Sequence, residues 1–169
     1  MIKRPRTPPT ACGAVGSPFK SVVVIRDLDA LLAEPNQIGW SVTAPRRSTM
    51  RLASVRPAGT TVNVVSLYVA FVRSGPMRVE LIETVPGTIF AEAGLHHMGV
   101  FVDDLTETSE RLVREGWPRL AWGLDDDDHI ARTVVHGHPL LDCRIGLVPA
   151  AARAAVDAWC EDDMPPPNS

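Results

Sequence analysis

An internal repeat constrains this fold more than any other feature of the sequence, because a doubled unit is expected to fold twice in the same way. The segment VVIRDL begins at Val23, and the similar segment VFVDDL begins at Val100. A Gly-Trp pair follows each segment at the same spacing, and RVELI, from Arg78, resembles RIGLV, from Arg144. Each half is therefore predicted to contain a strand, a helix, a Gly-Trp corner and then further strands.

Local signals support this reading in both halves. In the second half, apolar residues alternate at strand period from Met98 to Val102, and Asp104 then begins a helix that Gly116 ends. In the first half, Pro35 ends a shorter helix over residues 29–34. A β-rich run follows at residues 61–72, and a Gly-Pro turn leads into a strand over residues 78–83.

These patterns predict an α+β fold in which two βαβββ repeats form a curved, half-open barrel around a central cavity. Strands outnumber helices and no glycine-rich phosphate loop is visible, so a doubly wound parallel sheet is not expected. We predict one domain over residues 19–149, with the first repeat at about residues 19–90 and the second at about residues 95–149. The remaining predicted segments are a disordered leader (1–18), a C-terminal helix (150–160) and a disordered tail (161–169).

Bulk composition limits the classes of function. The chain has 169 residues, 45% of them hydrophobic, which suits a single globular core. A formal net charge of −3 predicts neither nucleic acid nor a membrane surface as a partner, and no apolar run approaches the ~20 residues of a membrane span. Three widely separated cysteines form no disulfide framework, so we expect a cytoplasmic protein.

Strand alternation and the repeat nominate the side chains of the cavity. The apolar face of the strand from Met98 to Val102 is expected to lie beneath the helix, so His97 faces the cavity and His96 points away from it. The repeat relates four positions, which are Lys20, Glu80, His97 and Gly146. Of these, only Glu80 and His97 carry ordinary metal-ligand side chains.

At these residues the chain resembles the vicinal oxygen chelate superfamily, which includes glyoxalase I, methylmalonyl-CoA epimerase, extradiol dioxygenases and bleomycin-resistance proteins. The resemblance is carried by VELIETVPGTIF (79–90), GLHHMGVFVDDL (94–105) and, more weakly, VVVIRDLDALL (22–32). In metal-dependent members the four ligand positions would fall on Lys20, Glu80, His97 and Gly146. A protonated ammonium and a glycine cannot donate a side-chain lone pair, so the resemblance implies loss of the four-ligand metal site.

The candidate residues have alternative interpretations. Glu80 and His97 form an acid/base pair, a remnant metal pair, or a polar pair that holds the two halves in register. Lys20 would neutralise Glu80, and Lys20, His97 or His136 would supply the positive charge or proton that a metal supplies in related proteins. His136 is either a cavity histidine, acting in catalysis or as a third metal ligand with His97 and Glu80, or part of a strand-end turn. The aromatic and histidine residues that could bind a substrate, unless they only pack, are Phe101, Tyr68, Trp122 and His138.

Three hypotheses about function follow. The first is an isomerase, lyase or cyclase of secondary metabolism that moves a proton on a small carbonyl-containing metabolite without a cofactor. The second is a metal-free binding protein that sequesters a drug-like ligand, as bleomycin-resistance proteins do. The third keeps a divalent metal on His97, Glu80 and His136. The expected partner is a small molecule, and a homodimer is compatible with the resemblance.

Overall fold

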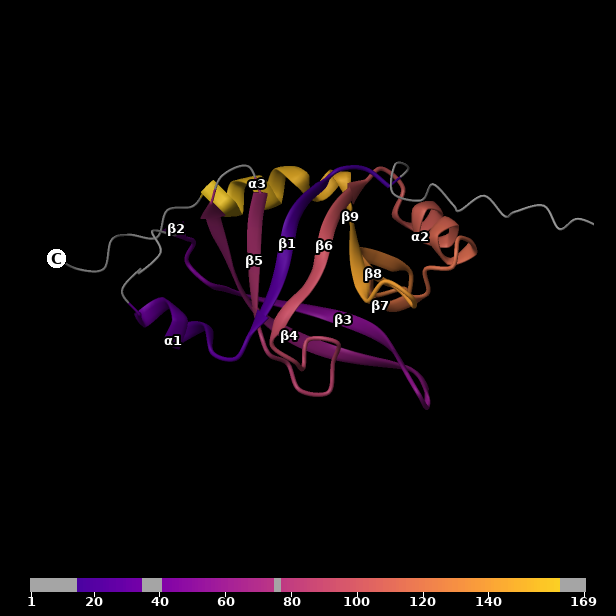
Figure 1. The fold of residues 1–169 in the computed structure, drawn as a ribbon, viewed down its shortest axis with the longest axis horizontal. Coiled ribbons are helices and arrows are strands. Elements are labelled where there is room, and N and C mark those ends of the chain that lie inside the picture. The colour runs from indigo at the N-terminus through magenta and orange to yellow at the C-terminus, as the bar shows by residue number, and fades with distance from the viewer. Residues whose placement is uncertain (1–14, 35–40, 75–76, 162–169) are drawn as a thin grey trace, which may run out of the picture.

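The computed structural model describes residues 15–34, 41–74 and 77–161 (Figure 1). The elements are β1 (Pro18–Ile25), α1 (Leu28–Ala33), β2 (Ser41–Val42), β3 (Arg46–Arg56), β4 (Gly59–Ser74), β5 (Met77–Glu83), β6 (Gly94–Val102), α2 (Leu105–Arg114), β7 (Arg119–Leu124), β8 (Ile130–His138), β9 (Cys143–Pro149), a 3₁₀ turn (Ala150–Ala152) and α3 (Arg153–Glu161). Most of the predicted leader and tail, the first Gly-Trp corner and the Gly75-Pro76 turn lie outside the described residues.

The two repeats have the same strand order. In the first, the sheet runs β3-β4-β5-β1, and in the second it runs β7-β8-β9-β6. In each repeat the strand before the helix pairs in parallel with the last strand, β1 with β5 and β6 with β9. The predicted βαβββ duplication and the α+β class are therefore confirmed, with the short strand β2 added beside β4.

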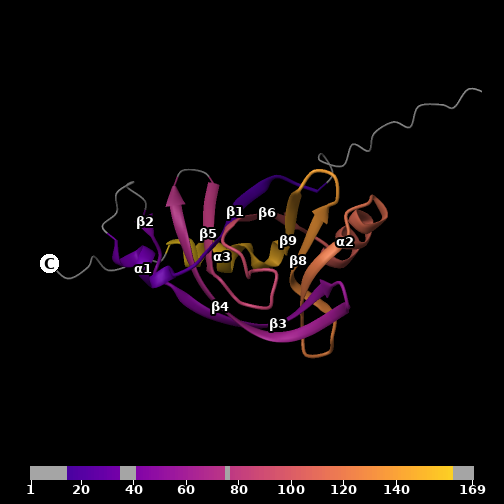
Figure 2. The same cartoon turned by 60° about the horizontal axis from the view of Figure 1, so that its bottom comes forward.

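Two ladders join the repeats into a barrel. Strand β1 pairs antiparallel with β6, and residues 51–54 of β3 pair antiparallel with residues 121–124 of β7. The ring of pairings then closes through eight strands, and Figure 2 shows them curving around a common interior. The predicted curved barrel is therefore present. The β1–β6 ladder joins the repeats along one edge, and the short β3–β7 ladder closes the other.

The helices α1 and α2 pack on the outside of the barrel and are capped alike. The Asp27 carboxylate accepts a hydrogen bond from the Ala30 backbone N–H, and Asp104 accepts one from that of Glu107. Beneath α2 lie Val100 and Val102 of β6, as the alternation predicts. Within the described residues, no helix has the length and apolar character needed to cross a membrane.

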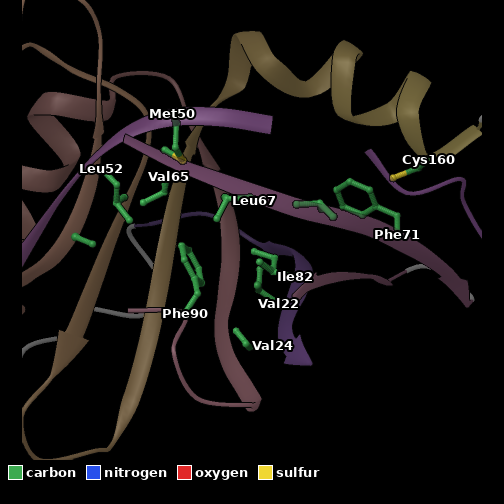
Figure 3. Packing of buried hydrophobic residues seen from close by; sticks show 12 residues of the cluster. Val22, Val24, Met50, Leu52, Val65, Leu67, Phe71, Ile82, Phe90 and Cys160 are labelled. Carbon is green, nitrogen blue, oxygen red and sulfur yellow. The ribbon is translucent and has the colours of Figure 1, made fainter. Parts of the chain in front are cut away.

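The interior of the barrel holds the largest apolar cluster, shown in Figure 3. Strands β1, β3, β4 and β5 contribute most of it, and Phe90 enters from the segment between β5 and β6. Helix α3 closes one end, since Cys160 belongs to the cluster and Val156 and Trp159 pack against it. The 3₁₀ turn and α3 thus occupy residues 150–161, where the sequence predicts a C-terminal helix over residues 150–160.

Phe71 provides a test of this interior. It lies on β4, is 1% exposed and packs against Trp159 of α3. Replacing it, as Phe71→Ala, removes an aromatic ring from a closed core and should lower the free energy of unfolding by about 3–5 kcal/mol. Urea denaturation measures the change. The matched control Val64→Ala, on the same strand but 72% exposed, should alter stability by less than about 0.5 kcal/mol. Equal losses in the two variants would contradict the assignment of the core.

Candidate functional site

An ion pair between neighbouring strands of the first repeat forms one part of the site. Lys20 lies on β1 and Glu80 on β5, and the parallel register places Val22 opposite Glu80. The Lys20 Nζ donates a hydrogen bond to a carboxylate oxygen of Glu80, and the side chains are only 9% and 14% exposed. Charges at this depth lose most of their hydration, so each depends on its partner. The predicted neutralisation of Glu80 by Lys20 is present in the structure.

Two glycines of the second repeat provide the space in which Lys20 and His97 lie. A Cβ added at Gly99 would come within 2.6 Å of the Lys20 Cγ, so the lysine stem crosses the bare backbone of β6. A Cβ added at Gly146 would come within 2.4 Å of the His97 Nε2, so the imidazole occupies the place of a side chain there. The four positions related by the repeat therefore lie on the adjacent strands β5, β1, β6 and β9.

A β-bulge in β6 changes the prediction for the paired histidines. Val22 pairs with His97, but Val23 pairs with Leu95, so His96 is an additional residue in the ladder. Both histidines are buried, at 6% and 7% exposed, and their Nδ1 atoms lie 2.7 Å apart. The prediction that His96 points away from the cavity that His97 faces is therefore wrong, because strict alternation of side chains holds only in a regular strand.

Burial and neighbouring cations favour the neutral form of both imidazoles. Burial lowers the pKa of His97 well below its ordinary value, and His96, Lys20 and Arg144 lower it further. Burial lowers the pKa of His96 to about 4, against a raising effect of the Ile89 carbonyl and with a further lowering by Arg144. The site thus combines an ammonium–carboxylate pair with uncharged imidazoles.

Helix α3 covers the end of the barrel at which Lys20 lies. Figure 1 shows it crossing the ends of β5, β1, β6 and β9. Its Asp157 forms an ion pair with Arg78, and its Trp159 meets the Phe71 ring edge-on with 5.0 Å between centroids. The same Phe71 ring lies 5.9 Å from the Lys20 Nζ. Aromatic rings and α3 therefore shield the Lys20–Glu80 pair from water and strengthen its electrostatic field.

His136 does not join this group. It is completely buried on β8, where its Nδ1 lies 2.8 Å from the Trp117 carbonyl oxygen and its Nε2 lies 2.9 Å from the Ser109 Oγ of α2. Both ring nitrogens are thus used beneath the outer helix. The structure therefore does not bring His136 together with His97 and Glu80, because it faces the helix-covered side of the sheet. Its roles in catalysis and as a supplementary metal ligand stay predictions.

Among the predicted substrate-binding residues, Phe101 lies at the covered end of the barrel. Its ring stacks on Phe19 with 3.7 Å between centroids, and the Arg153 guanidinium of α3 lies 4.2 Å from its centroid. Phe19 is adjacent to Lys20 in β1, and the Lys20 Nζ lies 5.4 Å from the Phe19 ring. Phe101 is therefore part of the wall around the ion pair.

The other three predicted substrate-binding residues lie elsewhere. Tyr68 donates a hydrogen bond to Asp29 of the outer helix α1 and is stacked by Arg47. Trp122 packs against the cluster beneath α2, and His138 meets Trp117 edge-on at 4.8 Å. For these three residues the packing alternative is the one that the structure supports.

The acidic run from Asp125 to Asp128 forms a self-contained surface loop. The Asp125 carboxylate accepts hydrogen bonds from the backbone N–H groups of Asp127 and His129, and Arg51 binds the Asp128 carboxylate. The backbone of the loop and Arg51 of β3 therefore supply hydrogen bonds to the Asp125 and Asp128 carboxylates.

The sequence reasoning missed Arg144 and the role of His96. Both lie on the wall of a cavity of about 550 Å³ at the end of the barrel opposite α3. Arg144 is the repeat counterpart of Arg78, which was the one available signal, since the two begin the related segments RVELI and RIGLV. No pattern in the sequence predicts the bulge that places His96 against His97.

The residues present do not fit the four-ligand metal site that the resemblance implies. The Lys20 ammonium occupies the first ligand position and is bonded to the carboxylate at the second. The His97 ring fills the space of the fourth, which Gly146 leaves empty. Within residues 15–34, 41–74 and 77–161, no group of three or more histidine, cysteine, aspartate or glutamate side chains is arranged to hold a metal ion.

Comparisons with known proteins agree with this architecture. The chain belongs to the Glyoxalase/Bleomycin resistance protein/Dioxygenase superfamily, whose sequence profile matches residues 21–131. Among curated protein sequences, none matches the chain. The family resemblance seen in the sequence is thereby confirmed.

The similar solved structures include several methylmalonyl-CoA epimerases. The Mycobacterium tuberculosis enzyme aligns with a TM-score of 0.53 and 12% identity over 87% of this chain and 97% of its own. A methylmalonyl-CoA epimerase in complex with methylmalonyl-CoA and NH4+ aligns with a TM-score of 0.53 and 16% identity, over 82% and 97% of the two chains. A Streptomyces coelicolor epimerase variant with 2-nitronate-propionyl-CoA gives the same four values. Identities this low show a shared fold.

Gly146 tests the packing of the site. The variant Gly146→Ala places a methyl group where the His97 ring lies, so the ring must move, and the free energy of unfolding should fall by about 1–3 kcal/mol. Urea denaturation measures this loss. In the control Gly137→Ala, on β8, the new methyl group meets the flexible end of Leu120, which can rotate, so the loss should be smaller. Equal stability of Gly146→Ala and the native protein would contradict the described position of His97.

The buried neutral histidines predict loss of stability in mild acid. The pKa of His96 is about 4 in the folded protein, against 6.5 for an ordinary histidine, so the unfolded chain binds more protons between these pH values. The free energy of unfolding should therefore be greatest above about pH 6.5 and fall toward pH 4, with His96 contributing up to about 1.4 kcal/mol per pH unit. Urea unfolding at pH 7 and pH 5 measures the slope.

The control variants isolate this contribution. His96→Gln should reduce the decline between pH 7 and pH 5, whereas His129→Gln, at a side chain 77% exposed, should leave it unchanged. An identical decline in His96→Gln and the native protein would assign the acid sensitivity to other groups.

Proposed function

We propose that this protein is an enzyme that moves a proton at the carbon next to a carbonyl group of a small metabolite, in an isomerase-type reaction. The observation that carries the proposal is the buried Lys20–Glu80 ion pair with the neutral His97 on the neighbouring strand. A cation, a carboxylate and an uncharged base in a water-poor interior are suited to this chemistry. Membership of the superfamily and the epimerase-like fold support it.

Each group has a role in such a reaction. Removal of the proton next to a carbonyl leaves negative charge on the carbonyl oxygen, and the Lys20 ammonium would stabilise that charge. Glu80 would hold the Lys20 ammonium in place. His97 would accept the proton, because burial and the nearby cations keep its imidazole neutral. Shielding by α3 would strengthen these interactions by excluding water.

A second function is supported by the same ion pair. Lys20 and Glu80 satisfy each other inside the protein, so they can form a stable polar floor beneath a ligand that is bound and not converted. The protein would then sequester a small molecule, as the bleomycin-resistance members of its superfamily do. Catalysis and sequestration differ in whether proton exchange occurs at the bound ligand.

Deuterium exchange separates the two functions. The native protein is incubated in D₂O with methylmalonyl-CoA, the ligand of one structural neighbour, and with a panel of smaller acyl compounds that carry an acidic α proton. Mass spectrometry measures deuterium at the α carbon. We expect exchange with at least one compound, and a loss of at least about 10²-fold in His97→Ala and in Glu80→Gln, because each removes a group of the acid/base machinery.

The control is Glu110→Gln, on the exposed face of α2, which should exchange at the native rate. Full activity of both His97→Ala and Glu80→Gln would refute the enzymatic proposal. Saturable binding without exchange, undiminished in Glu80→Gln, would favour sequestration.

The absence of a fitting ligand set predicts that the reaction is independent of a divalent metal. Protein purified without chelator should contain far less than one divalent metal ion per chain by elemental analysis, and exchange activity should survive dialysis against EDTA. One ion per chain, together with loss of activity on its removal and recovery on its return, would contradict this prediction.

A further inference from the structure

Three polar groups beside the site form a continuous hydrogen-bonded chain. The His96 Nε2 lies 2.9 Å from the Ile89 carbonyl oxygen, and the His96 Nδ1 lies 2.7 Å from the His97 Nδ1. His97 is the last member of this hydrogen-bonded series, and its Nε2 faces the backbone of Gly146. His96 is thus bonded at both nitrogens, and His97 is bonded at Nδ1.

The chemistry of these groups sets the position of each proton. A carbonyl oxygen only accepts hydrogen bonds, so the His96 Nε2 carries a hydrogen. In neutral His96 the Nδ1 is then an acceptor, and the hydrogen between the rings belongs to the His97 Nδ1. Neutral His97 therefore has an unprotonated Nε2, whose lone pair is directed toward Gly146.

The surroundings favour this neutral pair over a charged one. Both rings are buried, and the charged groups that act on them are the cations Arg144 and Lys20. Neither imidazole forms an ion pair with a carboxylate of the described residues. The other ring against His96 is Phe90, with 4.9 Å between centroids, which provides no charge.

The segment before β6 is folded so that the Ile89 carbonyl reaches His96. The buried Thr88 donates its hydroxyl hydrogen to the Val85 carbonyl oxygen at 2.8 Å and accepts a hydrogen bond from the Phe90 N–H at 3.0 Å. The Val85 N–H donates in turn to the Phe90 carbonyl oxygen at 2.9 Å. These bonds enclose Ile89 in a short closed turn and hold its carbonyl oxygen in place.

We propose that His96 is a positioning residue that fixes His97 as the Nδ1–H tautomer, with the Nε2 lone pair facing the interior of the site. The bulge in β6 is the structural device, since only the additional residue brings His96 onto the same side as His97. The use of this lone pair to accept a substrate proton rests on the proposed function, whereas the tautomer does not. His97 then serves first as a proton acceptor and becomes a donor only after it has been protonated.

Nitrogen-15 NMR of the full-length protein labelled at histidine tests the tautomer directly at pH 7. The His97 resonances are assigned by their loss in His97→Gln. The expected result is an Nε2 shift typical of an unprotonated imidazole nitrogen and an Nδ1 shift typical of a protonated one. A protonated Nε2 in the native protein would overturn the proposal, whatever compound the protein acts on.

Two variants test the role of His96. In His96→Asn the amide oxygen can take the place of the Nδ1 acceptor, so the His97 tautomer should be retained. In His96→Leu no acceptor remains, and a protonated His97 Nε2 should appear. Exchange activity, where present, should fall by about 10-fold or more in His96→Leu and be partly rescued in His96→Asn, as for other outer groups that orient a histidine.

A folded His96→Leu with an unchanged His97 tautomer would refute the positioning role, and thermal unfolding identifies a variant that has not folded. If His96→Leu does not fold, the comparison of His96→Asn with the native protein decides, since loss of the Nδ1–H tautomer in that variant would also refute it. Absence of exchange activity in the native protein would contradict the proposed function and leave the tautomer result standing.

Discussion

The pairing of β1 with β6 joins the two repeats, and the arrangement of the site depends on it. Strand β1 is bonded on one side to β5, in parallel, and on the other to β6, antiparallel. Its register puts Lys20 opposite Gly99 and Val22 opposite His97. A shift of one residue would turn the alternate side chains of β1 to the other face and separate Lys20 from Glu80. Main-chain hydrogen bonds between the repeats therefore hold the polar groups together.

The two halves of the site have become chemically different although their backbones are related. The first repeat supplies a buried ammonium and carboxylate that neutralise each other. The second supplies glycines at two register partners, and the resulting space is filled by the Lys20 stem and the His97 ring. The first repeat thus provides charge at the site, and the second provides space for the side chains.

Because of this division, the four related positions hold an ion pair, an imidazole and a glycine, which do not fit a four-ligand metal site. Lys20 supplies positive charge without a lone pair, and it also disfavours a second cation on the nearby imidazole. Helix α3 covers this part of the barrel. The resulting burial keeps His97 neutral and favours the hydrogen bond from Lys20 to Glu80. The β6 bulge adds His96 to this arrangement. The Ile89 carbonyl oxygen, in the turn before β6, holds His96 through a hydrogen bond with its Nε2.

The sequence anticipated the features that depend on local periodicity and on the repeat. Alternation at Val100 and Val102 identified the face beneath α2, Asp104 identified the start of that helix, and the repeat offset placed Lys20, Glu80 and His97 on neighbouring strands. It failed where a strand departs from regular alternation, as at His96. The sequence also left the position of His136 open, because alternation predicts that alternate side chains share a face but does not say which face is covered.

The sequence by itself determined the duplication, the order of strands and helices and the residue types available for chemistry, because these follow from spacing along the chain. The tertiary structure alone decided which of those residues meet. The register of the strand ladders places Glu80 beside Lys20, and the bulge places His96 against His97. His136 instead forms a hydrogen bond with Ser109 of α2, on the other face of the sheet. Each of these depends on contacts between segments far apart in the chain, and no local pattern of residues encodes such a contact.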